Sequence, residues 1–128
     1  MNHQELMKFR NDVMRFVEFN RRKRNCVNLN THNSWQHEFL KCKICYDLQK
    51  CGKQYITEAP LSKNGIKTCQ ADILVLDNAT CFEIMVSETI ESLRYKCQKF
   101  PNELKIYGVR SWEDYVSERF EIINNQYL

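Results

Sequence analysis

Residues 69–87 read CQADILVLDNATCFEIMVS and hold two apolar runs joined at Asp77-Asn78. The alternation of side chains and the Asp-Asn pair predict two strands folded side by side as a hairpin. Each run carries one acid, Asp72 in the first and Glu83 in the second. Burying a carboxylate is costly unless a cation compensates it. We therefore expect the two acids to converge on a divalent metal that prefers oxygen ligands.

Length and composition predict one compact domain. The chain has 128 residues, of which 43% are hydrophobic and only three are Gly and two Pro. That length supports one real core and is too short for two, and the composition argues against a disordered or fibrous chain. We expect a single domain over 1–128, with an N-terminal helix and basic connector in 1–33, a core in 34–110 and a C-terminal helix in 111–128.

Charge and hydropathy limit the partners. The net charge of +3 permits contact with an anionic partner without demanding one. No run approaches the roughly 20 apolar residues of a membrane helix, so we expect no membrane partner. The start, MNHQELMKFRND, is polar and contains acids, unlike a signal or transit peptide. We expect an intracellular, cytoplasmic protein.

Seven cysteines are many for this length and odd in number. An odd count without regular spacing favours reduced, packed thiols over a secreted disulfide framework. Cys42 and Cys45 have the spacing of half a zinc site, but the sequence has no second pair of this kind. A small zinc-stapled interaction module is therefore the weaker alternative, and buried thiols are preferred.

The hydrophobic periodicity predicts an order of elements. The spacing of apolar residues and the caps predict helices over 3–20, over 34–51, over about 90–100 and from 111 onward, and strands over 53–58, over the two runs of the hairpin and over 104–109. The segment SKNGIKT between the first two strands is expected to be a polar loop. The core is thus αβββαβ, an α/β fold with a mixed sheet flanked by helices and one extra helix at each end.

Several side chains are expected in the core. Leu40, Ile44, Leu48 and Cys51 form the buried stripe predicted for the second helix. Trp35, Tyr55 and Trp112 are most simply core aromatics.

This order of elements, with its acids, resembles the PD-(D/E)xK nuclease superfamily and its restriction-endonuclease-like fold. The archaeal Holliday-junction-resolvase-like branch is the most similar. The resemblance covers residues 34–110 and rests on four segments: HEFLK at 37–41, QADI at 70–73, FEIMVSET at 82–89 and LKIYGVR at 104–110.

The resemblance implies a metal-dependent DNA endonuclease that hydrolyses phosphodiester bonds, including structure-specific forms of that activity. Asp72 and Glu83 match the acids that bind magnesium or manganese in the superfamily, together with the main-chain carbonyl of Ile84. Glu38 matches an acid on the first core helix that completes the catalytic site. Individual acidic motifs are weak signals, so the implication depends on their order along the chain.

One residue departs from the family pattern. Met85 stands where the family motif has its lysine, and a thioether can neither hold a proton for water activation nor stabilise negative charge. Lys41, three residues after Glu38 and on the same helical face, is the preferred catalytic substitute, ahead of Lys43 and Lys96. The alternative for Glu38 and Lys41 is an ordinary surface ion pair.

Two functions therefore stay open from the sequence. One is the endonuclease, and the other is a catalytically impaired nuclease-fold protein that binds nucleic acid or a protein partner. The sequence also leaves open whether the protein acts as a homodimer. The cations expected to contact DNA are Arg21, Arg22, Lys23, Arg24, Lys63, Lys67, Arg94, Lys96 and Lys99.

Overall fold

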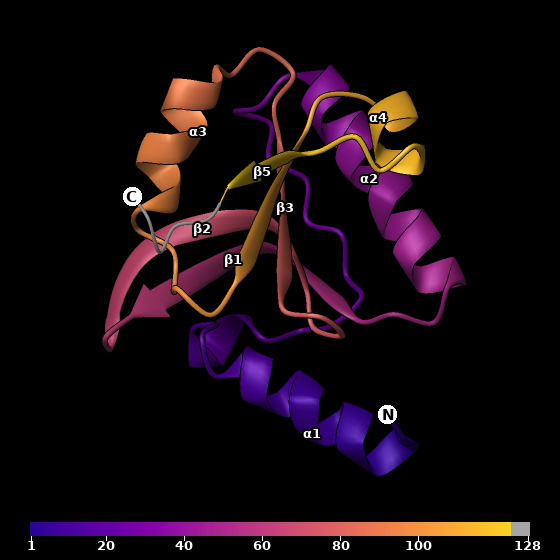
Figure 1. The fold of residues 1–128 in the computed structure, drawn as a ribbon, viewed down its shortest axis with the longest axis vertical. Coiled ribbons are helices and arrows are strands. Elements are labelled where there is room, and N and C mark those ends of the chain that lie inside the picture. Colours follow the sequence, from indigo (N-terminus) through magenta and orange to yellow (C-terminus); the bar gives the residue numbers. More distant parts are fainter. Residues whose placement is uncertain (124–128) are drawn as a thin grey trace.

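The chain folds into an α/β structure with a mixed, open sheet (Figure 1). A computed structural model describes residues 1–123, and within them there are five strands and four α-helices. The elements are α1 (His3–Met14), the short 3₁₀ helix η1 (Phe19–Arg21), α2 (Trp35–Lys50), β1 (Tyr55–Lys63), β2 (Ile66–Val75), β3 (Thr80–Ile84), α3 (Ile90–Cys97), β4 (Lys105–Val109), α4 (Trp112–Val116) and β5 (Glu121–Ile123).

The strands lie in the sheet in the order in which they occur in the chain. β1, β2 and β3 form an antiparallel meander, β4 runs parallel to β3, and β5 is antiparallel to β4. A parallel pair needs a crossover connection, and α3 supplies it. The predicted order of helix, three strands, helix and strand is therefore confirmed from α2 to β4.

Helices cover both faces of the sheet (Figure 1). α1 and α3 pack on one face, where Val13, Leu93 and Leu74 belong to one apolar cluster. α2 and α4 cover the other face, where Ile44 and Phe82 belong to a second cluster. Because alternate side chains of a strand point to opposite faces, each central strand contributes to both clusters.

The second helix begins and ends where the sequence indicates. The hydroxyl of Ser34 accepts a hydrogen bond from the amide of His37 at 3.2 Å, so it caps the helix. Gly52 follows the last turn with φ at +74°, a conformation that glycine adopts without strain. These signals fix α2, which carries part of the candidate site, within one residue of its predicted bounds.

The first helix and the first hairpin differ from the prediction. α1 ends at Met14, and Val17, expected inside the helix, instead forms a β-bridge with Leu61. The segment expected as a polar loop is the tip of the β1–β2 hairpin, where Asn64 and Gly65 both have positive φ. That conformation at both central residues is typical of a tight hairpin turn.

The predicted C-terminal helix is much shorter than expected. α4 ends at Val116, and Glu121–Ile123 pair with β4 as strand β5. Pairing satisfies the backbone groups of β4 that a helix would have left at an open edge, and it buries Ile123 in the core. Residues 124–128, which the prediction also placed in this helix, lie outside the described residues.

Two predictions of buried side chains were wrong. Cys51 is exposed because it follows the last helical residue as the cap of α2. Trp35 is 72% exposed and Trp112 is half-buried, whereas Tyr55 is buried as predicted. Of the zinc-like pair, Cys45 is buried and Cys42 is half-buried, and burial raises the pKa of the Cys45 thiol to about 12.

None of the helices found between residues 1 and 123 has the length and the apolar character needed to cross a membrane.

Candidate functional site

The two predicted acids meet where β2 and β3 separate. The backbone pairing of these strands ends at Ile73 and Phe82, so the next opposed residues are Asp72 and Glu83. Instead of a backbone ladder, each carboxylate accepts a hydrogen bond from the other strand. The amide of Asp72 donates to Oε2 of Glu83, and the amide of Ile84 donates to Oδ2 of Asp72, both at 2.9 Å. The side chains thereby replace two backbone hydrogen bonds.

Both acids are withdrawn from solvent, and their pKa values move in opposite directions. Glu83 is fully buried and Asp72 is 9% exposed. Burial, together with the charge of Asp72, raises the pKa of Glu83 to about 8. Burial alone would also raise the pKa of Asp72, but the hydrogen bond from His37 and the charge of Lys96 hold it below its ordinary value.

Lys96 of α3 supplies a cation to this pair of carboxylates. Its Nζ lies 2.7 Å from Oε1 of Glu83, and its side chain is 35% exposed. Burial would lower the pKa of this ammonium, but the charges of Glu83 and Asp72 raise it above its ordinary value. Among the residues described, no hydrogen bond of normal geometry reaches Oε1 of Glu83. The negative charge on this oxygen is therefore compensated by the ion pair with Lys96.

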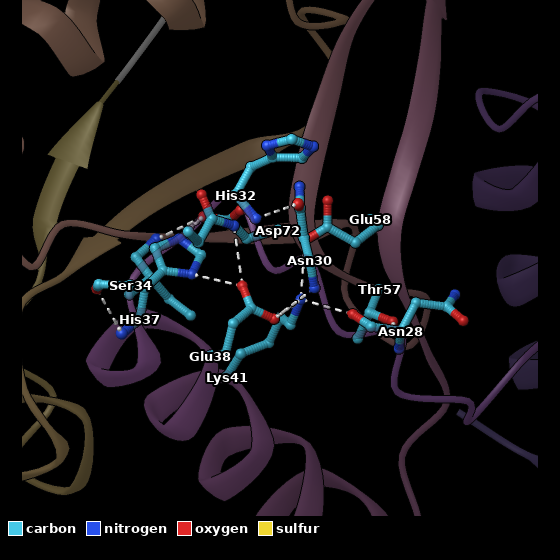
Figure 2. Close-up of polar contacts among 12 residues, drawn as sticks. Asn28, Asn30, His32, Ser34, His37, Glu38, Lys41, Thr57, Glu58 and Asp72 are labelled. Atoms are coloured by element: carbon cyan, nitrogen blue, oxygen red, sulfur yellow. Dashed lines mark hydrogen bonds and ion pairs between the residues drawn. The ribbon is translucent and has the colours of Figure 1, made fainter.

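His37, near the start of α2, joins Asp72 to a second group of charges (Figure 2). Its Nε2 lies 3.3 Å from Oδ2 of Asp72, and its Nδ1 lies 3.0 Å from Oε1 of Glu38. Burial lowers the pKa of the ring, but the contacts with the two carboxylates leave it raised. Since an imidazolium donates from both nitrogens, the charged ring satisfies both acids at once.

The second group centres on Lys41, which is fully buried. Its Nζ lies 2.5 Å from Oε2 of Glu38, 2.8 Å from Oε1 of Glu58 and 2.7 Å from the carbonyl of Asn28. The side-chain amide of Gln70 donates a hydrogen bond from Nε2 to Oε2 of Glu58, the oxygen that Lys41 does not contact. Glu38 and Lys41 thus form the predicted ion pair, but the pair is buried and does not lie on the surface.

Glu58 reaches this cluster through an unusual backbone conformation. Its φ is +49°, and the pairing of β1 with β2 continues from Thr57 to Ala59 without it. A non-glycine residue in the left-handed region is strained, and such strain is found preferentially at functional sites. Asp72 therefore lies where the pairing of β2 is interrupted on both sides, at Glu58 of β1 and at the end of its pairing with β3.

The predicted residues fall into two linked sets. Asp72, Glu83 and Lys96 lie together at the strand opening, and Ile84 binds Asp72 through its amide. Glu38 is connected to them through His37. Lys41 lies at the other end of this chain of contacts, where its ammonium binds Glu38, Glu58 and the carbonyl of Asn28.

Met85 occupies a packing position. It is fully buried in the cluster under α1 and α3. Gly108 of β4 accommodates it, since a Cβ at that glycine would lie 2.3 Å from Sδ of Met85. Lys43 is also outside the site, because it is exposed and its Nζ lies over the rings of Phe39 and Trp112.

Two hollows adjoin Asp72. One, of about 310 Å³, is lined by Ser34, His37, Ile84 and Ser87, and the other, of about 330 Å³, is lined by Asn30, Glu58, Gln70 and Lys99. Both hollows include Asn33, Asp72 and Lys96 in their walls. Asp72 and Lys96 are therefore accessible from two sides.

The remaining predicted cations have mixed positions. Arg22 donates to the carbonyl of Val17, and Arg24 donates to Gln54 and Asn11, so both have structural partners. Lys63 contacts the carbonyl of Gln98 and the side chain of Asn102. Arg21, Lys23, Lys67, Arg94 and Lys99 are exposed.

Sequence reasoning overlooked His37, Glu58 and Gln70 as parts of the site. His37 lies next to Glu38 in the segment HEFLK, and Gln70 lies two residues before Asp72 in the segment QADI, so both have a signal in the sequence. Glu58 has no such signal, because its role depends on a local change of backbone conformation.

Residues 1–123 contain no group of three or more His, Cys, Asp and Glu side chains arranged to hold a metal ion. Comparisons with protein-family models, curated proteins and solved structures return no match to this chain. The resemblance to the nuclease superfamily therefore rests on the quoted segments and their order.

Lys41→Ala should reduce the free energy of unfolding by about 3–5 kcal/mol, because it leaves Glu38 and Glu58 buried without their common cation. Urea denaturation followed by circular dichroism measures the change. Lys43→Ala is the matched control on the exposed side of the same helix, and it should change stability by less than about 1 kcal/mol. Equal effects of the two substitutions would contradict a buried role for Lys41.

Glu83→Gln should stabilise the metal-free protein more at pH 8.5 than at pH 5.5. The pKa of Glu83 is about 8 in the folded protein and near its ordinary value of 4.5 when unfolded. Folding is therefore penalised increasingly as pH rises from 4.5 to 8, and glutamine removes this penalty. In thermal melts, the Tm of Glu83→Gln minus the Tm of the parent should be larger at pH 8.5 than at pH 5.5 by roughly 3 °C or more.

Glu91→Gln, on the exposed side of α3, provides the control for this titration, and its effect should be the same at both pH values. A gain for Glu83→Gln that does not change with pH would contradict the raised pKa.

Proposed function

We propose that this protein is a metal-dependent DNA endonuclease that hydrolyses phosphodiester bonds. The observation that carries the proposal is the opening between β2 and β3, where Asp72 and Glu83 bind each other's strand and Lys96 lies 2.7 Å from Glu83. Asp72 and Lys96 border both hollows, and Glu83 lies fully buried behind them. Two acids and a lysine are the groups that metal-assisted phosphodiester hydrolysis uses.

The proposal of a metal draws on the kind of donor present, since a hard divalent cation prefers oxygen ligands, and it does not draw on a ready-made cluster, because residues 1–123 hold no group of three or more metal-binding side chains. Two carboxylates share a buried gap, and burial and their mutual repulsion raise the pKa of Glu83 to about 8, so a cation there would offset a real electrostatic cost. Asp72 and Glu83, with the main-chain carbonyl of Ile84, would hold magnesium or manganese, which when bound polarises a phosphate ester and lowers the pKa of a bound water.

Lys96 is the best candidate for the work of the missing motif lysine. Its Nζ is held at Glu83 while its side chain is 35% exposed and borders both hollows, so it can stabilise the negative charge that develops on a phosphate entering either of them. Lys41, preferred from the sequence, is neutralised by two carboxylates and fully buried. We assign Lys41 the structural role of holding Glu38.

His37 acts as a positioning residue in this proposal. Its ring lies between Asp72 and Glu38 (Figure 2), and Glu38 is itself fixed by Lys41. The orientation of the Asp72 carboxylate is thus set by a chain of charged contacts that reaches into α2. Asn33, Asp72 and Lys96 border both hollows, which suits a DNA strand that continues on both sides of the reacting phosphate.

A second candidate is a nuclease-fold protein that binds nucleic acid without cutting it. Its support is that Lys96 already occupies Oε1 of Glu83, while Met85 is buried in the core. In this second candidate, the ammonium of Lys96 balances the charge of the acids in place of a metal ion.

The purified protein should nick or cut DNA in magnesium or manganese and be inactive in EDTA. Asp72→Asn and Glu83→Gln should each abolish cleavage while retaining DNA binding, because each removes a charge needed for the metal. Linear, supercoiled and branched substrates analysed on gels provide the measurement. Glu91→Gln should cut like the parent.

Folded parent protein that cuts none of these substrates, but still binds DNA, would support the non-cutting candidate. Full cleavage by either acid variant would show that the catalytic acids are elsewhere.

Lys96→Ala should lower the cleavage rate by roughly 10²- to 10³-fold, the loss typical of removing one group that stabilises developing charge. The single-turnover rate at saturating protein measures chemistry apart from binding. Lys105→Ala, an exposed lysine at the start of β4, is the control and should cut normally. A Lys96→Ala variant with the parent's single-turnover rate would exclude Lys96 from catalysis.

A further inference from the structure

The exposed side of α2 carries aromatic rings that the fold does not use. Trp35, Phe39 and Tyr46 are 72%, 59% and 71% exposed. The rings of Trp35 and Phe39 meet edge to face with centroids 6.3 Å apart. Large aromatic side chains contribute most when buried, so three on the solvent side of one helix indicate a contact surface.

The charges of this surface, which we call the α2 aromatic face, have one sign. Lys43 and Lys50 are exposed on the same helix, and Nζ of Lys43 lies 5.6 Å from the ring centroids of both Phe39 and Trp112. The two acids of α2 are engaged elsewhere. Glu38 binds Lys41, and Asp47 accepts a hydrogen bond from the hydroxyl of Tyr115 at 2.6 Å. The face therefore offers rings and cations without a competing exposed carboxylate of its own helix.

The α2 aromatic face begins at the candidate site. Ser34 and His37 line the 310 Å³ hollow beside Asp72 and Lys96. Trp35 stands between them in the sequence, at the first helical position after the Ser34 cap. Residues two apart on a helix lie on nearly opposite sides of it, so His37 faces the hollow and Trp35 faces away from it. A strand that leaves the hollow past Ser34 therefore reaches Trp35 and then Phe39 by passing around the N-terminal end of α2.

We propose that the α2 aromatic face binds unpaired bases of single-stranded DNA that leaves the site. The inference rests on the proposed function, and it adds that the substrate has a single-stranded part. Unpaired bases expose their ring faces and stack on aromatic side chains, while lysines attract the phosphates. Bases of a duplex are already stacked within the helix, so the face distinguishes single strands from double strands.

Binding of a 20-nucleotide oligo(dT) in EDTA tests the proposal, with fluorescence anisotropy as the readout. The double variant Trp35→Ala/Phe39→Ala should bind roughly tenfold or more weakly than the parent, as expected for losing two stacking rings. Phe19→Ala removes an 86% exposed ring on η1 and is the matched control, which should bind like the parent. Thermal melts of the variants should match the parent, since these side chains are exposed.

An abasic strand of the same length separates stacking from phosphate attraction. The parent should bind it about as weakly as the double variant binds oligo(dT). Trp112→Phe leaves Trp35 as the sole tryptophan, and its emission should be quenched by oligo(dT) but not by the abasic strand.

Equal binding of oligo(dT) by the parent and the double variant would overturn the proposal. A parent that elutes as a dimer, with a monomeric double variant, would assign the face to a second copy of the chain and overturn it too. If the parent cuts DNA but binds oligo(dT) no better than the double variant, only the role of the α2 aromatic face is rejected. If the parent binds oligo(dT) more tightly than the double variant but cuts no DNA, only the endonuclease proposal is rejected.

Discussion

The opening between β2 and β3 is the constraint on which the candidate site depends. A continuous antiparallel ladder would place Asp72 and Glu83 directly opposite each other, but the pairing of the two strands stops one residue earlier, at Ile73 and Phe82. β3 pairs with β4 along its whole length, from Thr80 to Ile84, whereas its pairing with β2 stops at Phe82. The freed amides of Asp72 and Ile84 are then satisfied by carboxylates, since a buried donor without an acceptor is costly. The fold therefore needs a side chain that accepts a hydrogen bond at each of these two positions.

The compensation of those acids organises both neighbouring helices. α3 contributes Lys96 to Glu83, and α2 contributes His37 to Asp72. Buried charges of this kind are not a strong source of stability, because desolvation offsets much of their attraction. Apolar residues at positions 72 and 83 would leave two backbone amides without acceptors, but neutral amide side chains would accept the same hydrogen bonds. The negative charge of the network is therefore better explained by what it does at the two hollows than by folding alone.

Much of the framework follows from local signals in the sequence. The hairpin around Asp77-Asn78, the cap at Ser34 and the stop at Gly52 act within a few residues, so the acids could be placed on their strands correctly. The sequence could not predict that Lys96, and not Lys41, lies beside Glu83. Helical spacing relates residues of one helix and says nothing about which strand that helix contacts. β5 was missed for a similar reason, since its pairing with β4 is a tertiary choice that overrides a helical pattern.

The positions of Met85 and Lys96 both depend on how α3 packs against β4. A side chain at position 108 would collide with Sδ of Met85, and also with Leu93 of α3, whose Cδ2 would lie 2.8 Å away. Gly108 thus lets Met85 and Leu93 settle on β4 together, which holds α3 against the sheet. Lys96 stands three residues after Leu93, on the same side of the helix, so this contact also brings its ammonium to Glu83. A lysine at position 85 would place its charge in an apolar cluster and would loosen the helix that carries Lys96. The methionine at position 85 and the lysine at position 96 are therefore structurally coupled.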